Sequence, residues 1–252
     1  MRKFTYALLL LLIGTLAFSF VPGRDSFFSG QGAQQDPRVE RSNKARRAFP
    51  VADFNEPEPD TNSASGRAKK EKRQRYDAFG FVPPKVEPWV AEVVQSPEGY
   101  FSFPALPVAE SDVVLVAVVS SSEAHLSASK KGVFSEFNLT VESVLKTSSQ
   151  DIKEGSVITA DRIGGYVKYP NGQQVLIRVI GVNMPQVGSR YLLFLRAKWK
   201  PDLIIMTGYE LTSEGIVPLD LTGQFLNLGG ITETELQKRV RDLLTSSQRT
   251  ND

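Results

Sequence analysis

The sequence predicts a mainly β fold, a small OB-like barrel or sandwich with a C-terminal helix, preceded by a signal segment and a disordered tail. Two observations support this class: short apolar segments alternate with glycine-containing turns, and one stretch near the C-terminus has helical periodicity. The predicted boundaries are a signal peptide or signal anchor at 1–21, a disordered Pro- and charge-rich linker at 22–95, a β-barrel domain at 96–228, and a helix and tail at 229–252.

The first residues have the pattern of an export signal. Arg2 and Lys3 precede an apolar run at 7–21. As a helix that run spans about 22 Å, less than the roughly 30 Å of a bilayer core. We therefore expect a cleaved signal and a secreted or periplasmic protein, with an uncleaved membrane anchor as the alternative.

The next segment, 22–95, is predicted to be a disordered linker. It is polar, carries many prolines and lacks apolar periodicity, so it offers little surface to bury. One part of it is strongly basic. Its cations form either a solvated stretch of linker or a patch that contacts an anionic lipid or cell-wall polymer: Arg67, Lys69, Lys70, Lys72, Arg73 and Arg75.

Regular secondary structure is clearly expected from Asp112 onward. The unbroken apolar run at 113–119 is rich in valine and predicts a buried strand. Residues 136–142 alternate between apolar and polar, which predicts a strand with one solvent-facing side, and 124–129 is expected to pair with it. The run at 191–195 is apolar on both faces, so we expect a covering element over it.

That covering element is predicted to be the C-terminal helix. Thr232 and Glu235 have the spacing of a capping box. The helix then places its apolar residues along one stripe, at Leu236, Val240, Leu243 and Leu244. We expect this stripe to cover the outer side of residues 191–195.

Three segments of the predicted strands, 111–114, 137–146 and 187–195, are similar to the core of OB-like barrels of the netrin-module type. Tissue inhibitors of metalloproteinases carry that module, and exported bacterial proteins have a similar skeleton. The resemblance covers 110–211, about 40% of the chain, and implies an OB-like barrel. Those inhibitors present a terminal cysteine to the catalytic zinc. This chain has no cysteine, so the resemblance does not carry over protease inhibition.

Composition excludes several kinds of chemistry. Without cysteine there is no thiol catalysis, and with a single histidine a protein-ligated zinc or copper site is not expected, so we predict no metal and no cofactor. The net charge is +2, with no strong field to attract nucleic acid, and none is expected as a partner. The lone histidine, His125, is expected to face solvent in a serine-rich turn. The Asp-Leu-Thr-Gly at 220–223 is interpreted as a loop.

The predicted ligand-binding residues are Arg162, Tyr166, Lys168 and Tyr169, which lie between glycine turns. Exposed aromatic rings beside cations stack on sugars or peptides. The alternative is that both tyrosines pack over one end of the barrel.

Together these observations predict a non-enzymatic binding module of the cell envelope or secreted space, whose partner is a protein, a glycan or a cell-wall polymer. The alternative is an envelope-acting hydrolase that uses carboxylates, for which Asp112, Glu136, Glu142 and Asp161 are available.

Overall fold

The computed structural model describes residues 49–77, 92–95, 103–199 and 202–249, all within the unit formed by residues 37–252. The predicted signal segment lies outside the described residues. The elements, in chain order, are β1 (Val51–Asp53), α2 (Ala64–Asp77), β2 (Glu92–Gln95), β3 (Val113–Leu126), β4 (Val133–Lys146), β5 (Val157–Ile163), β6 (Gly165–Lys168), β7 (Gln174–Val179), β8 (Arg190–Trp199), β9 (Asp202–Thr212), β10 (Gly215–Pro218), α3 (Gly223–Leu226) and α4 (Glu233–Arg249).

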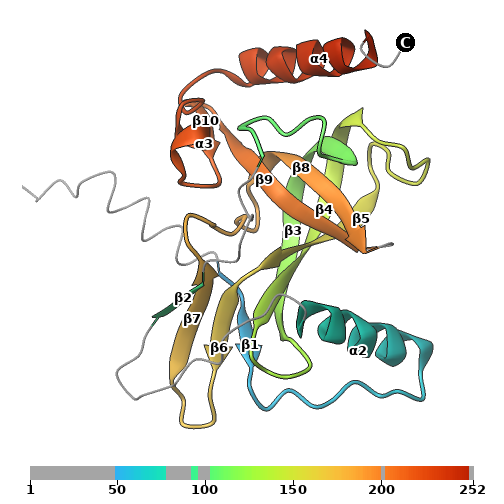
Figure 1. Ribbon diagram of the computed structural model, residues 1–252, viewed down its shortest axis with the longest axis vertical. Coiled ribbons are helices and arrows are strands. Elements are labelled where there is room, and N and C mark those ends of the chain that lie inside the picture. The colour runs from blue at the N-terminus through green and yellow to red at the C-terminus, as the bar shows by residue number, and fades with distance from the viewer. Residues whose placement is uncertain (1–48, 78–91, 96–102, 200–201, 250–252) are drawn as a thin grey trace, which may run out of the picture. The chain divides into compact units, whose positions relative to one another are not determined.

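The larger of the two sheets has the order β10-β9-β5-β4-β3-β8, and β8 also pairs with β9 (Figure 1). The pairings β9–β5–β4–β3–β8–β9 thus return to their starting strand and form a ring. The contact between β5 and β9 is parallel, and the other pairs in this ring are antiparallel. The predicted class, mainly β with a C-terminal helix, is confirmed.

The first half of strand β3 is buried on both sides because its side chains enter two separate clusters. Leu115 and Ala117 lie in the cluster enclosed by the ring of strands. Val114 and Val116 point the other way, into a second cluster that includes the apolar face of α4. Alternate side chains of a strand point to opposite faces, so an unbroken apolar run contributes side chains to both clusters.

Helix α4 covers the outer side of β8, as the sequence predicts. Leu236 and Val240 are fully buried and share their cluster with Leu192 of β8. The backbone N–H of Glu235 donates to the Thr232 hydroxyl at 3.2 Å, which supplies one half of the expected capping box. Leu243, one of the four predicted stripe residues, is 40% exposed.

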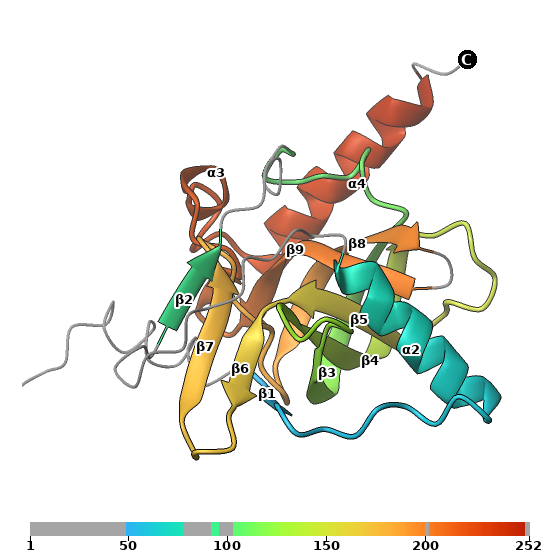
Figure 2. The same ribbon diagram turned by 60° about the horizontal axis from the view of Figure 1, so that its bottom comes forward.

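The second sheet has the order β1-β6-β7-β2, with parallel pairs at both edges and an antiparallel hairpin in the middle. It packs against the far half of the long β3–β4 hairpin (Figure 2). Leu126 and Val133 of the hairpin share a core with Ala52, Val167 and Ile177 of the sheet. The hairpin therefore contributes side chains to the cores of both sheets.

The prediction of disorder is wrong for the part of 22–95 that the structure describes. Phe49 is buried in the ring's core, and Ala52 is buried in the core between the second sheet and the β3–β4 hairpin. This segment therefore does bury apolar surface. Helix α2 follows, and the hydroxyl of Ser63 caps its first turn by accepting from the N–H of Gly66 at 3.0 Å. Within the described residues, no helix is long and apolar enough to cross a membrane.

Candidate functional site

The candidate site lies where α2 crosses the outer face of β4 and β5 (Figure 2). Glu136 of β4 and Asp161 of β5 are directly paired across the ladder. Their neighbours Phe137 and Ala160 belong to the ring's interior cluster, so the two carboxylates point outward toward α2.

A lysine from α2 sits between these carboxylates. The Lys72 Nζ atom lies 2.8 Å from Asp161 Oδ1 and donates a hydrogen bond to Glu136 Oε1 as well. The Asp161 side chain is only 1% exposed, so its main compensation for lost water is this ammonium and its other hydrogen bonds.

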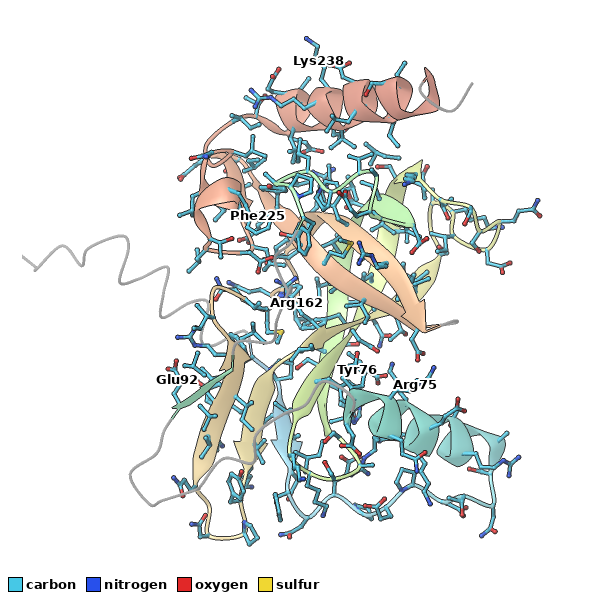
Figure 3. All side chains as sticks on the ribbon, in the orientation of Figure 1. Arg75, Tyr76, Glu92, Arg162, Phe225 and Lys238 are labelled. Atoms are coloured by element: carbon cyan, nitrogen blue, oxygen red, sulfur yellow. The ribbon has the colours of Figure 1, made fainter. Side chains whose placement is uncertain are left out.

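Tyr76 fixes the end of α2 nearest the strands, where Figure 3 shows it beside Arg75. Its hydroxyl donates to Asp161 Oδ2 at 3.0 Å. Its ring stacks on Phe134, a residue on the same outer face as Glu136. Arg75 pairs with Asp202 at the start of β9, with 3.0 Å between Nη2 and Oδ2. One turn of α2 therefore contacts three strands.

The lone histidine belongs to this site and does not face solvent. His125 is 3% exposed, and its Nε2 atom lies 3.0 Å from Glu136 Oε2. Its Nδ1 atom is 3.8 Å from Glu56 Oε1 in the loop before α2. The expectation of an exposed turn is wrong because β3 continues to Leu126 and the segment around α2 covers it.

The two facing carboxylates have opposite pKa shifts. Burial raises the pKa of Asp161 to about 6, and the charge and hydrogen bond of Lys72 offset only part of that effect. Burial also acts to raise the pKa of Glu136, but hydrogen bonds from His125 and Lys72 outweigh it and lower that pKa to about 2. Burial acts to lower the pKa of Lys72, and the two carboxylates together raise it. The ammonium is therefore charged at neutral pH.

The structure places Arg162, the first of the predicted ligand-binding residues, inside the protein. Its side chain is 0% exposed and forms an ion pair with Asp220, which is also 0% exposed (Figure 3 labels Arg162). Arg162 therefore offers no surface to an external ligand. Its pairing also gives Asp220, predicted to lie in a loop, a structural partner.

The other three predicted residues lie together on or just after β6. Tyr166 packs edge-on against Phe49, with 6.4 Å between ring centroids, and Tyr169 stacks on Phe54 at 5.1 Å. Both tyrosines are half-buried, whereas Lys168 is exposed. Both rings thus have partners within the protein.

Sequence reasoning missed the role of the basic stretch. Lys72, Arg73 and Arg75 turn toward the protein, and Arg73 Nε donates to the Leu126 carbonyl at 2.9 Å. Lys70, by contrast, is exposed. The available signal was Ser63, a good helix N-cap, followed by a run of helix-forming residues that ends in a tyrosine.

Comparison with protein-family models, curated proteins and solved structures finds no match to this chain. Among the described residues there is no group of three or more histidine, aspartate or glutamate side chains placed to hold a metal ion.

Proposed function

We propose that the protein is a non-catalytic binding module of the cell envelope or secreted space, and that the outer face of β4 and β5 binds cationic side chains of a protein partner. The observation that carries the proposal is the ammonium of Lys72, held between Glu136 and Asp161. A face that binds one ammonium so closely has the charge and shape to bind others.

The position of the face supports the proposal. In OB-like barrels the face of the second and third strands is a common ligand site, and β4 and β5 are the second and third strands of this ring. This face offers carboxylates beside an aromatic ring, which suits lysine, arginine and tyrosine side chains. Anionic cell-wall polymers would be repelled, so a protein is the favoured partner.

The extracytoplasmic location rests on the sequence pattern of residues 1–21. N-terminal sequencing of the protein purified from its source tests it. A mature N-terminus downstream of residue 19 supports export with cleavage. An intact Met1 in a membrane fraction supports the uncleaved anchor, and an intact Met1 in the cytosol contradicts export.

The binding function is tested by capture from the envelope fraction with the full chain immobilised. Three baits are compared: wild type, the double variant Glu136→Gln with Asp161→Asn, and Glu154→Gln as a control that removes one exposed acid. We expect a protein that wild type and the control retain and the double variant loses. A partner held equally by all three baits would place binding elsewhere on the molecule.

A second candidate function, an envelope-acting hydrolase, is favoured by two acids that face each other across β4 and β5, Glu136 and Asp161. Asp161 would donate its proton to a leaving oxygen while the Glu136 carboxylate acts as base or nucleophile. Because Asp161 is buried, α2 has to move first. Release of reducing ends from envelope polysaccharide, lost with Asp161→Asn and with Glu136→Gln, would support it over the binding module.

A further inference from the structure

Helix α2 is attached to the β4–β5 face mainly by polar contacts. Arg73 and Tyr76 are its only buried residues. The remaining attachments are ion pairs and hydrogen bonds, such as those of Lys72 and Arg75. Ion pairs near the surface weaken in salt, and a helix that buries little apolar area is among the first parts of a protein to open.

The face beneath α2 does not depend on the helix for its geometry. Glu136 and Asp161 are fixed by the ladder between β4 and β5, and Phe134 is paired with Ile163 in the same ladder. His125 is paired with Phe134 between β3 and β4. When α2 leaves, the paired strands that carry these side chains remain in place.

The segment before α2 can stay attached while the helix moves. Strand β1 pairs in parallel with β6, with Val51 opposite Tyr166, and Phe49 lies in the ring's core. Residues 54–63 connect this anchor to the helix. The anchor keeps α2 close to the face, so α2 competes at a high effective concentration with any molecule that binds there.

We propose that α2 is an internal competitor that occupies the β4–β5 face in place of a basic helical segment of a partner protein. This inference rests on the proposed function. The side chains that α2 presents are Lys72, Arg75 and Tyr76, which follow the i, i+3, i+4 spacing of one helix face. A partner helix with a lysine, an arginine and a tyrosine at this spacing meets the same carboxylates and the same Phe134 ring.

The probe is a fluorescent synthetic peptide of residues 62–77, with a control peptide in which the lysine, arginine and tyrosine at positions 72, 75 and 76 are alanine. The receptor is the full chain, as wild type and as an opened variant, Lys72→Ala with Tyr76→Ala. Lys70→Ala is the matched control, because it removes an exposed charge from the same helix. Circular dichroism and thermal melting establish that each variant is folded.

We expect the probe to bind the opened variant at least tenfold more tightly than wild type or Lys70→Ala, and more weakly as salt is raised. Adding Glu136→Gln and Asp161→Asn to the opened variant is expected to abolish binding, and the control peptide is expected not to bind. A folded opened variant that does not bind the probe overturns the inference.

A second variant tests the inference without weakening the helix. Asp77 Oδ1 lies 2.6 Å from Ser129 Oγ, and the chain has no cysteine, so Asp77→Cys with Ser129→Cys gives a single engineered pair. In the oxidised form the disulfide is expected to keep α2 on the β4–β5 face, so that the envelope partner no longer binds. Reduction is expected to restore binding of the partner. The two single-cysteine variants control for the substitutions.

The outcomes separate this inference from the proposed function. A partner held equally by the oxidised and reduced forms keeps the binding module but overturns the role of α2 as competitor. If no envelope protein depends on Glu136 and Asp161 while the peptide still binds the opened variant, the proposed function fails and, because no partner is displaced, the role of α2 as competitor fails with it. A wild-type dimer in light scattering that becomes a monomer with Glu136→Gln and Asp161→Asn would overturn the assignment of a separate partner and make a second copy the occupant.

Discussion

The ring of Tyr76 on α2 lies parallel to the ring of Phe134 on β4, with 3.8 Å between their centroids and 4° between their planes. The same tyrosine donates its hydroxyl proton to Asp161 on the neighbouring strand. One side chain therefore makes both an apolar and a polar attachment between the helix and the sheet. Because few other side chains of α2 are buried, this residue is expected to control how often the helix opens.

Replacing Tyr76 separates its two contributions. Tyr76→Phe keeps the stack and loses one hydrogen bond, worth about 1 kcal/mol, and should raise the rate of tryptic cleavage in α2 roughly fivefold. Tyr76→Ala loses both contacts and should raise it well over tenfold. Gln74→Ala, at an exposed position of the same helix, is the control. Equal cleavage rates in all four proteins would show that Tyr76 does not hold the helix.

The buried ion pair of Arg162 and Asp220 predicts that replacing one partner lowers stability more than replacing both. Arg162→Met leaves the Asp220 carboxylate buried without its cation and should lower the free energy of unfolding by about 3–5 kcal/mol. Arg162→Met with Asp220→Leu removes both charges and should cost less than the single variant. Urea unfolding of the full chain measures both. A single variant as stable as wild type would contradict the structural role.

The pKa of Asp161 predicts a specific dependence of stability on pH. It is about 6 in the folded protein against 3.8 for an unperturbed carboxyl group, so the folded state binds this proton more tightly than the unfolded state. The stability from this protonation is fully present below about pH 3.8 and is lost as the pH rises through 6. Wild type should therefore lose stability relative to Asp161→Asn between pH 4 and pH 7, as measured by melting temperature.

Glu136 should have the opposite effect at lower pH. Its pKa falls from 4.5 to about 2 on folding, so its contribution is present above pH 4.5 and is lost as the pH falls toward 2. The melting temperature of Glu136→Gln should accordingly change less than that of wild type between pH 5 and pH 2.5. If the melting temperatures of the two proteins change equally with pH, the pKa of Glu136 is not lowered on folding.

The space around Gly208 indicates how tightly β8 and β9 are packed. A Cβ atom at this position would lie 2.6 Å from Leu193 Cδ2 and 2.9 Å from the Leu192 carbonyl oxygen. Gly208→Ala should lower the free energy of unfolding by about 1–3 kcal/mol because the neighbouring strand has to shift. Gly223→Ala is the matched control, since nothing lies within 4 Å of its Cβ position. Equal stability of the two variants would show that the strands have room.

The sequence predicts most strands of the ring because their signal is local. Alternation along β4 and the apolar run in β3 reflect which face each residue buries, and both patterns can be read without the partner strand. The stripe of α4 is found in the same way. Each of these elements uses apolar periodicity, the strongest pattern that a single sequence carries.

The acids and cations of the candidate site are named from the sequence, but their contacts could not be predicted because these contacts are polar and join residues distant in sequence. Helix α2 lacks an apolar stripe, so composition alone makes it resemble a solvated linker. The carboxylates that neutralise Lys72 lie on two strands far along the chain. The burial of Arg162 is missed for a related reason, since its partner Asp220 follows β10.

The parallel pairing of β1 with β6 has a consequence for the order in which the protein assembles. Lys72 and Asp161 are separated by 89 positions, so residues 49–77 leave the ribosome long before the strands that receive them. During that interval the basic segment has no site within its own chain. It is therefore available to other molecules before it docks onto β4 and β5.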